Sequence, residues 1–273
     1  MASNVQSEII GLDDWWTTPP GQHLLVWEQS RFDEAVVDLF GFNALQLGVP
    51  ELDALRANRM PQRWLSLPHT ETLVARAVVA AVPHQLVADP AALPFPDNSL
   101  DLMVLPHTLE FSADPHATLR EVWRVLRPEG RVVLSGFNPF SLWGVRQFAA
   151  HLCARAGVSG AGLSRPYLPR AGDLIAPGRL RDWLRLLNLD VEANRFGVYQ
   201  PPVGSTRWLQ RLGWVDGLGR RWWPILGAVY FMVAVKRVQG VRLLGPAWKP
   251  YRSLAPVRSA NAAGRSTSDL ESP

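Results

Sequence analysis

The sequence predicts an α/β fold in which a mostly parallel sheet is covered by helices on both faces. Short apolar segments rich in Val and Leu alternate with segments of helical spacing, which is the pattern of a parallel sheet buried on both sides. The chain has 273 residues, enough for one large α/β domain or two small ones. Its apolar fraction of 47% excludes a chain that is disordered throughout.

The first third of the chain begins with an arm. Residues 1–27 are expected to form this arm, with a Trp15–Trp16 pair and a turn at Pro19–Pro20–Gly21. A helix is predicted from Gln29 to Gly41, because apolar residues recur at helical spacing. A short helix that starts with proline is predicted at 50–58. Strands are predicted at 43–48, 63–67 and 84–88, and residues 70–82 fit either a helix or a strand.

The middle of the chain gives clearer signals. A strand is predicted at 100–105, and Asp114–Pro115 opens a helix as its N-cap and first-turn proline. Arg127–Gly130 is expected to end this helix before a strand at 131–135. The next helix, at about 141–155, has one apolar face that consists of Leu142, Val145, Phe148, Ala149 and Leu152.

The last part of the chain is less regular. Residues 157–172 are rich in Gly, Ser, Pro and Arg and are expected to form a mobile loop or lid. A last strand at 228–235 is expected at a sheet edge or as an antiparallel return, and the tail from about Ser259 is expected to be disordered. Between them we predict a helix at 180–188, a strand at 191–199 and a Trp- and Arg-rich helical stretch at 205–221.

Charge is unevenly distributed along the chain. Residues 1–136 hold 9 basic and 17 acidic residues, whereas residues 137–273 hold 19 basic and 7 acidic residues. A basic half can attract phosphates, RNA or acidic lipid surfaces. The simpler interpretation is a solvated surface, because the arginines are scattered and form no dense run.

The sequence disfavours a disulfide, a metal site, a transmembrane segment and secretion. Cys153 is the single cysteine, which excludes an internal disulfide, and the six histidines lack metal-ligand spacing, so no metal is expected. The longest charge-free apolar run, 222–235, has 14 residues, fewer than the roughly 20 of a membrane span. With acidic residues near the amino terminus and no secretory signal, we expect a cytoplasmic setting and no transmembrane segment.

In parallel sheets, ligands bind beyond the carboxyl ends of the strands. The residues that follow the predicted strands are Gly48, Asp89, Pro106–His107 and Gly136. One carboxylate, one imidazole and two glycines are therefore expected to line one rim of the sheet.

Residues 84–136 resemble a known family. They combine Val87–Ala88–Asp89, the loop Leu93–Pro94–Phe95, a strand containing Asp101, and Arg124–Gly130 before another strand. This combination is similar to the class I S-adenosylmethionine-dependent methyltransferases, most of all to the type 11 group with its quinone-pathway and small-molecule enzymes. The resemblance implies a Rossmann-like seven-stranded sheet in a domain at 28–245, a substrate-side insertion or lid at 156–226, and a disordered tail at 246–273.

The resemblance also implies roles for single residues. Asp89, between Ala88 and Pro90, holds the position of the acid beside the adenine of S-adenosylmethionine; an ordinary turn acid is the alternative. Gly48 is the first glycine of the loop that approaches the methionine part of this cofactor. The segment after the fourth strand covers the cofactor and faces the substrate, and here it consists of Leu105, Pro106 and His107.

The first glycine motif departs from the family pattern. Gln46 stands where the family has an acid, and Val49–Pro50 follows Gly48 where the family has further glycines. Valine and proline hinder close backbone approach, and proline also removes an amide donor. No clear acid follows the second strand, where the family binds the ribose. An alternative to an enzyme is therefore a catalytically inactive, methyltransferase-like protein that acts as a binding or assembly partner.

His107 is the candidate catalytic residue. A histidine here could deprotonate a hydroxyl or amine nucleophile, and Glu110 three residues later shares its helix face. The alternative is a histidine bonded to the backbone at a strand end. Asn138 and Ser141 could bind a substrate, but capping of the next helix is the simpler interpretation.

The stretch at 205–223 combines four tryptophans with four arginines. These could stack on and clamp a flat anionic ligand or a nucleobase. We expect instead a helix that packs its aromatic side chains inward and its arginines outward, which is the commoner arrangement.

The expected function is S-adenosylmethionine-dependent methylation of an unidentified small-molecule or lipid-like acceptor. Methylation of RNA is a less favoured alternative, suggested by the basic second half of the chain. The acceptor itself is bound by loops that vary freely on such a fold, so its identity stays open at this point.

Overall fold

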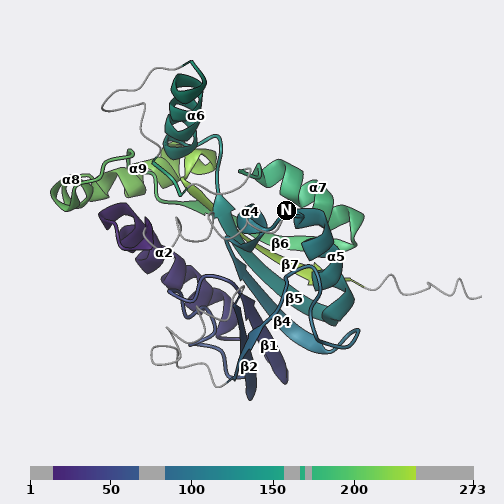
Figure 1. Ribbon diagram of the computed structural model, residues 1–273. Helices are drawn as coiled ribbons and strands as arrows, with labels where there is room; N and C mark the ends of the chain where they lie inside the picture. The colour runs from purple at the N-terminus through teal and green to yellow at the C-terminus, as the bar shows by residue number, and fades with distance from the viewer. Residues whose placement is uncertain (1–14, 68–83, 157–166, 170–173, 238–273) are drawn as a thin grey trace, which may run out of the picture. The chain divides into compact units, whose positions relative to one another are not determined.

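The computed structural model describes residues 15–67, 84–156, 167–169 and 174–237, and in this part a seven-stranded sheet forms the centre (Figure 1). The strand order is β3-β2-β1-β4-β5-β7-β6. Strands β1 to β5 pair in parallel, and β7 runs antiparallel between β5 and β6. The predicted α/β fold with a mostly parallel sheet is confirmed. The strands are β1 (Asn43–Leu47), β2 (Gln62–Leu67), β3 (His84–Val87), β4 (Leu100–Pro106), β5 (Leu126–Phe137), β6 (Leu189–Gly197) and β7 (Val229–Lys236).

Helices cover both faces of this sheet (Figure 1). Helix α2 (Pro19–Val36) lies on one side, and α5 (Pro115–Val125) and α7 (Pro177–Leu186) lie on the other. The hydroxyl of Thr18 caps α2 by accepting a hydrogen bond from the Gly21 amide. The turn predicted at Pro19–Pro20–Gly21 is therefore wrong, because proline suits the first turn of a helix equally well. The other helices are α4 (Thr108–Phe111), α6 (Leu142–Arg155), α8 (Thr206–Arg211), α9 (Gly213–Trp222) and the 3-10 turn η1 (Pro224–Leu226).

Two hydrophobic clusters fill the space between the sheet and these helices. On β4, Leu102 and Val104 belong to the cluster that includes α2, whereas Met103 and Leu105 belong to the cluster that includes α5 and α7. Side chains alternate between the two faces of a strand, so a strand buried on both faces needs apolar residues at nearly every position. This requirement explains the continuous apolar runs in the sequence.

The segment between β1 and β2 forms turns where a helix was predicted at 50–58. Its backbone bonds are isolated turns, such as Leu52 N to Val49 O at 3.2 Å. The Leu52 carbonyl, which a helix would bond to the amide four residues later, accepts from Gln46 Nε2 at 2.6 Å. The helix prediction is wrong because a buried side chain competes for the backbone acceptor that the helix needs.

Two strand predictions are refined by the structure. Strand β5 starts at Leu126, but 127–130 bulges out between the pairs Leu100–Leu126 and Leu102–Arg131, and Glu129 has a φ of 62°, so regular pairing with β4 begins at Arg131 as predicted. The antiparallel return predicted for 228–235 is confirmed, but its alternative place at a sheet edge is wrong. Strand β6 pairs along the outer side of β7 and forms the edge itself.

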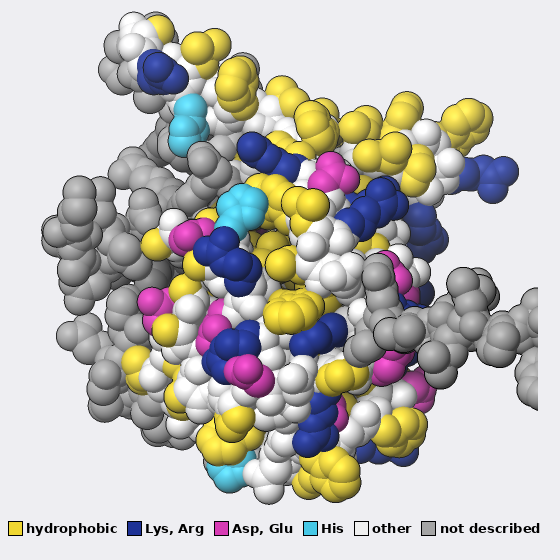
Figure 2. All heavy atoms as spheres, turned by 90° about the vertical axis from the view of Figure 1, so that its right-hand side faces the viewer, with side chains coloured by type: hydrophobic (Ala, Val, Ile, Leu, Met, Phe, Trp, Pro, Cys, Tyr) yellow, Lys and Arg dark blue, Asp and Glu magenta, His cyan; other side chains and the backbone are white. Residues whose placement is uncertain are grey.

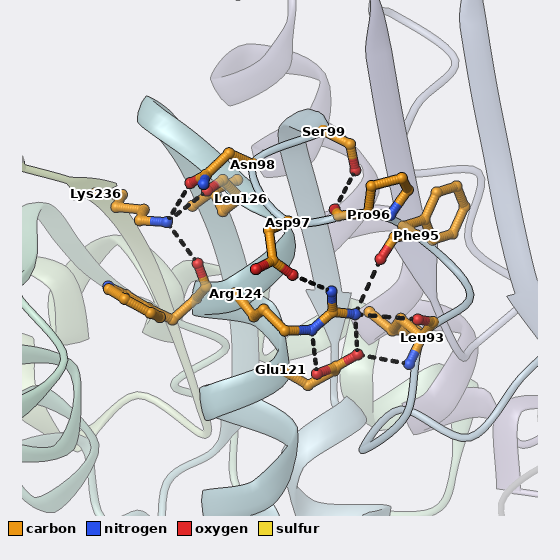
Figure 3. Close-up of polar contacts among 11 residues, drawn as sticks. Leu93, Phe95, Pro96, Asp97, Asn98, Ser99, Glu121, Arg124, Leu126 and Lys236 are labelled. Carbon is orange, nitrogen blue, oxygen red and sulfur yellow. Dashed lines mark hydrogen bonds and ion pairs between the residues drawn. The ribbon is translucent and has the colours of Figure 1, made fainter.

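The loop between β3 and β4 is fastened to α5 by the Arg124 guanidinium (Figure 3). This group forms ion pairs with Asp97 and Glu121 and donates to the carbonyls of Leu93 and Phe95. Charge-assisted and multiply bonded arginines hold a fixed geometry. The loop and the helix therefore form one unit.

Lys236 anchors the end of the same helix (Figure 3). Its ammonium donates to the carbonyls of Trp123 and Leu126 at 2.7 Å and to Asn98 Oδ1 at 2.8 Å. The ammonium also lies 4.3 Å from the centre of the Trp123 ring. A cation at the carboxyl end of a helix satisfies carbonyls that have no partner within the helix.

Helix α6 turns its apolar face away from the core. Trp143 and Gln147 are buried, and Trp143 Nε1 donates to the Gln200 carbonyl at 2.8 Å. The amide oxygen of Gln147 accepts from the backbone of Tyr167 and Leu168 at 3.0 and 3.1 Å. The apolar face that the sequence marks is consequently 55–72% exposed at Leu142, Val145, Phe148 and Leu152.

Helix α9 likewise presents aromatic side chains to solvent. A Cβ added to Gly219 would clash with the ring of Tyr199, so the helix approaches this ring through a glycine. On the same side, Asp216 accepts from the Tyr199 amide at 2.7 Å. Trp214 and Trp222 are 65% and 66% exposed. The expected inward packing of these tryptophans is wrong, because the inner face of α9 is occupied by glycine and aspartate.

Parts of the predicted organisation lie outside the described residues. These are the segment at 70–82, most of the loop at 157–172 and the tail at 246–273. Among the helices that the structure describes, none combines the length and apolarity that a bilayer crossing requires. In the same part of the chain, no three His, Cys, Asp or Glu side chains gather in a way that could hold a metal ion.

Candidate functional site

The carboxyl ends of the central strands bring the predicted rim together. Pro106 pairs with Ser135, and the His107 amide donates to the Ser135 carbonyl at 3.0 Å, so His107 follows β4 next to the end of β5. Gly136 was predicted to follow this strand but lies within β5, where it pairs with Tyr230 of β7. Strand β1 pairs with the other side of β4, which places Gly48 near the segment that starts at His107. Asp89 follows β3, the edge strand two positions beyond β1. The rim therefore has a centre at β1 and β4 and an outer part at β3.

The loop after β1 has an unusual backbone. Gly48 has a φ of 71° and Val49 a φ of 36°, both in the left-handed region. A β-branched residue in this region costs on the order of 1–3 kcal/mol. Among the described atoms, a Cβ on Gly48 would meet the Thr108 hydroxyl alone, at 3.7 Å. The loop thus keeps the conformation that glycine favours, although valine holds the second position and is 95% buried within the core cluster.

Gln46 holds this loop from inside. Its Nε2 donates to the carbonyls of Gly48, Val49 and Leu52 at 3.3, 3.1 and 2.6 Å. Its Oε1 accepts from the Ala54 amide at 3.0 Å. An amide offers both donors and an acceptor, whereas a carboxylate offers acceptors alone. Gln46 therefore closes the loop by donating hydrogen bonds to three carbonyls, which a carboxylate at this position could not do.

Asp89 forms a turn at the outer part of the rim. Its Oδ1 accepts from the Ala91 amide at 2.8 Å, which is an Asx turn, and the residue is exposed. The Ala88 amide donates to the Leu67 carbonyl at 3.3 Å, so this segment continues the pairing of β3 with β2. Pro90 follows within the turn and is partly exposed. The turn-acid geometry expected as an alternative for Asp89 is thus present, beside the end of β3.

His107 lies at the centre of a buried cluster of charged groups. Its Nε2 is 2.9 Å from Oε1 of Glu28, and its Nδ1 is 2.9 Å from Oε2 of Glu110. The imidazole has no exposed surface, and its ring centre lies 5.5 Å from that of Trp16 and 4.2 Å from that of Phe137. The expected alternative, a histidine bonded to the backbone, does not describe this side chain.

The two carboxylates control the protonation of this cluster. Burial alone lowers the pKa of the His107 imidazole, but the charges and hydrogen bonds of Glu28 and Glu110 raise it to about 10. Burial raises the pKa of the Glu110 carboxyl, against the opposing effect of its bonds to His107 and to the Phe137 amide. The cluster thus holds a charged imidazole next to a carboxylate of increased basicity.

A cavity of about 510 Å³ opens beside Glu110. Its size lies within the range of sites for small molecules. Gln147, His151 and Arg155 of α6 are the other polar residues of its wall, and Gln147 Nε2 lies 3.0 Å from Nε2 of His151. The rest of the wall is apolar or glycine and consists of Phe111, Phe137, Pro139, Gly144, Val145, Phe148, Leu168, Pro169 and Leu174.

Sequence reasoning missed Glu28. This residue lies on the buried stripe of α2, together with Leu24, Phe32 and Val36 at intervals of four residues, and all four are 0% exposed. A carboxylate in the middle of an apolar stripe is seldom stable without a partner. The position of Glu28 within this apolar stripe could therefore have indicated that the glutamate needs a cationic partner. The stripe alone could not identify His107 as that partner.

Asn138 and Ser141 have structural roles at the start of α6. The Ser141 hydroxyl accepts from the Gly144 amide at 3.1 Å, so the capping interpretation is confirmed for this residue. Asn138 Nδ2 donates to the carbonyls of Ile225 and Gly227 at 2.7 and 2.9 Å. Asn138 thus ties the end of β5 to the segment that precedes β7.

Comparison with known proteins gives the class of the chain. A methyltransferase domain family model matches residues 62–134. A methyltransferase in complex with the Trm112 methyltransferase activator of Haloferax volcanii superposes with a TM-score of 0.57 at 16% identity, over 85% of this chain and 99% of that one. An S-adenosylmethionine-dependent methyltransferase of Thermotoga maritima superposes with a TM-score of 0.54 at 15% identity, over 82% and 94%. At such identities these structures support the fold alone.

Two relatives extend the comparison. The chain is 32% identical to the uncharacterized protein YafS of Escherichia coli over 197 residues, which are 72% of this chain and 73% of that protein. It is 35% identical to demethylmenaquinone methyltransferase of Deinococcus radiodurans over 130 residues, 44% of this chain and 53% of that protein. The chain belongs to the class I S-adenosylmethionine-dependent methyltransferase family.

Proposed function

We propose that this chain transfers a methyl group from S-adenosylmethionine to an apolar, lipid-like small molecule bound in the cavity beside α6. Glu110 accepts the proton that the acceptor loses, and His107 positions Glu110 and stabilises its charge. The observation that carries this proposal is the Glu110 carboxylate at the wall of an otherwise mainly apolar cavity, bonded to a buried imidazole.

The surroundings of Glu110 support a role in proton transfer. A base is most effective when its pKa lies near the working pH, and burial raises the pKa of this carboxyl toward that range. His107 has no exposed surface, so it acts through Glu110 and not on the acceptor directly. The acceptor atom would gain the methyl group as the sulfonium S–CH₃ bond breaks, and S-adenosylhomocysteine would leave as the neutral thioether. The acceptor's proton would move to the Glu110 carboxylate, so charge and atoms balance.

The loop after β1 fits the cofactor's amino-acid part. We propose that Gly48 and Asp89 hold the cofactor, with Ala88, Pro90, Leu105 and Pro106 around it. This assignment is supported by the left-handed backbone at Gly48, where the space that a Cβ would fill is open apart from Thr108. When bound, S-adenosylmethionine supplies an electrophilic methyl group. Helix α4 carries both Thr108 and Glu110, so the loop and the cavity are joined within one helical turn.

The acceptor is inferred from the wall of the cavity and from the names of relatives. The wall is mostly apolar, with an arginine and a histidine on α6. Demethylmenaquinone methyltransferase of Deinococcus radiodurans is among the relatives, over about half of its length. An aromatic or quinone-like molecule with an acidic hydroxyl or ring carbon fits this chemistry.

Calorimetry with S-adenosylmethionine and S-adenosylhomocysteine tests the cofactor assignment. We expect both to bind, and Asp89→Ala to weaken binding at least tenfold. Asp97→Ala, in the same loop between β3 and β4, is the matched control and should bind normally. Absence of heat at millimolar ligand would remove the proposal.

Transfer of labelled methyl groups to lipid extracts tests the role of Glu110. We expect Glu110→Gln to slow transfer by about 10²–10⁴-fold while cofactor affinity changes less than threefold. Glu192→Gln, a surface carboxylate that pairs with Arg131 and Arg237, is the control. Equal activity of Glu110→Gln and the wild type would exclude Glu110 as the base.

A second candidate function is a methyltransferase-like binding protein without catalysis. It is supported by Gln46, whose side chain already satisfies three carbonyls and one amide of the loop after β1. A folded protein that binds neither cofactor form would favour this candidate. Binding of the cofactor together with methyl transfer to any extract component would exclude it.

A further inference from the structure

We propose that the outward faces of α6, α8, α9 and η1 form a surface that binds an anionic lipid membrane. This surface is called the outer face below and consists of the exposed side chains of 140–155 and 205–226. The proposal rests on exposure, residue type and charge, and it does not depend on whether the chain transfers methyl groups.

Exposed hydrophobic side chains are concentrated on the outer face. In the described part of the chain, 18 large hydrophobic side chains are exposed, and 12 of them belong to these two segments. Figure 2 shows hydrophobic side chains gathered along the upper part of the view, the level that α6, α8 and α9 occupy in Figure 1. Isolated exposed apolar residues are common, but a contiguous group of this kind marks a binding surface.

The type of these residues favours a membrane over a protein partner. Trp208, Trp214, Trp222 and Trp223 are each 55–66% exposed. Tryptophan is the side chain most characteristic of the boundary between lipid and water, because its ring is apolar and its N–H is polar. On α9, Trp214 and Trp222 stand eight residues apart with Leu218 midway, which makes one outward stripe.

The charge of the outer face favours an anionic partner. Residues 140–155 and 205–226 contain six arginines and one acidic residue. That acidic residue, Asp216, has a side chain that is 33% exposed, and it accepts from the Tyr199 amide and from Gln200 Nε2 and lies 3.7 Å from His23 Nε2. Arginines flanking an apolar stripe are the pattern of helices that lie in the interface of anionic membranes. The two segments therefore offer an excess of positive charge, and their single carboxylate is bonded to neighbouring groups.

The two segments are held together as one face. Both segments leave the same end of the sheet, because β5 and β6 each pair antiparallel with β7 and so run in the same direction. Residues 138–155 follow β5, and residues 198–226 follow β6. Asn138 Nδ2 donates to the Ile225 carbonyl, and the Arg146 guanidinium donates to the Pro202 carbonyl. These bonds fix α6 against the segment that includes α9 and η1.

The cavity beside Glu110 opens on this same face. Val145 and Phe148 belong to its wall, and they are 58% and 72% exposed. A membrane against the outer face would therefore reach the cavity without an intervening water layer. A lipid-soluble molecule could enter from the bilayer, which avoids the cost of crossing water.

Vesicle flotation of the full chain tests the proposal. The probes are vesicles of phosphatidylcholine alone and with 30% phosphatidylglycerol. We expect binding to the anionic vesicles at least tenfold stronger than to the neutral ones, and a steep loss in 0.5 M salt. Trp214→Ser/Trp222→Ser and Arg220→Gln/Arg221→Gln should each weaken anionic binding at least tenfold.

The control removes exposed aromatic side chains at the amino end of β1, whereas the outer face follows the carboxyl ends of β5 and β6. Phe40 and Phe42 precede β1 and are 79% and 67% exposed, and Phe40→Ser/Phe42→Ser should bind as the wild type does. Circular dichroism establishes that each variant is folded. If a variant fails to fold, the wild-type comparison of anionic vesicles, neutral vesicles and single-stranded RNA still decides.

Three results would overturn the proposal. One is no wild-type binding to anionic vesicles at millimolar lipid. Another is stronger binding to RNA than to vesicles at equal salt, which would assign the arginines to nucleic acid. The third is a wild-type dimer in light scattering that Trp214→Ser/Trp222→Ser converts to a monomer, because the outer face would then be covered by a second copy.

Discussion

Glu28 and His107 are 79 residues apart in sequence, yet Oε1 of the glutamate lies 2.9 Å from Nε2 of the histidine and neither side chain has exposed surface. This pair connects α2 to the segment that follows β4. Because a buried charge has no solvent to stabilise it, each member depends on the other. The helix that precedes the sheet and the candidate site are thus energetically linked.

Removing Glu28 should destabilise the fold strongly. Glu28→Ala leaves a buried imidazolium with one of its two carboxylates, and we expect a loss of about 3–5 kcal/mol in the free energy of unfolding. Glu34→Ala on the same helix is the control, since the Glu34 side chain is 48% exposed and should contribute less than about 1 kcal/mol. Urea unfolding measures both. Similar values for the two variants would contradict the buried ion pair.

Stability should fall as pH rises above neutrality. The pKa of His107 is raised from 6.5 to about 10, so its contribution is complete below pH 6.5 and is lost as pH rises through 10. The pKa of Glu110 is also raised, from 4.5, so its contribution has the same sign but begins to fall above pH 4.5, before that of His107. The slope should approach about 1.4 kcal/mol per pH unit for one proton. His107→Gln should flatten the profile between pH 7 and 10, and an unchanged slope in that variant would rule out this origin.

Restoring the family's acid at position 46 should damage the protein. Glu at this site would face the carbonyls that Gln46 Nε2 now binds, with no donor for any of them. We expect Gln46→Glu to cost about 2–4 kcal/mol, the combined effect of lost bonds and unsatisfied buried acceptors. Gln62→Glu, at the exposed start of β2, is the control in the same unfolding assay. A Gln46→Glu protein as stable as the wild type would mean that the loop is free to rearrange.

Glycine at position 49 should be tolerated unusually well. The substitution removes a buried side chain but also relieves the left-handed strain at a φ of 36°, worth about 1–3 kcal/mol. Val49→Gly should therefore cost about 1–3 kcal/mol less than Val133→Gly, which alters a fully buried valine in β5. Thermal unfolding of the two variants makes the comparison. Equal losses would show that Val49 is not strained.

The sheet was predictable because each buried strand is marked by an apolar run in its own residues. A strand buried on both faces needs an apolar run, and the run at 100–105 became β4 with Pro106 added. Helix α5 was equally clear, since Asp114 and Pro115 mark its start and Asp114 accepts from the Ala117 amide as a cap should. Local chemistry sufficed at these positions.

The partner of His107, the orientation of α9 and the absence of a helix at 50–58 could not be predicted, because they depend on contacts between segments that are distant in sequence. The partner of His107 lies on α2, and nothing near position 107 indicates Glu28. Helix α9 faces outward because Gly219 packs on Tyr199, a contact across 20 residues that helical spacing alone does not show. The missing helix at 50–58 has the same kind of cause, since Gln46 takes a carbonyl that the helix would have needed. Amphipathic spacing identifies an apolar face but not what, if anything, will cover it.

The segment between β6 and β7 is closed at its base. The Ala228 amide donates to the Val198 carbonyl at 2.8 Å, and a Cβ on Gly227 would lie 2.7 Å from the backbone of Gly197. Both ends of the segment therefore meet at one point above the antiparallel pair of β6 and β7. The register of this pair is consequently set below the segment, so exchanging 199–227 for a short hairpin turn should leave it intact. The exchange would still remove the carbonyls of Gln200, Pro202 and Ile225, which fasten this segment to 138–146.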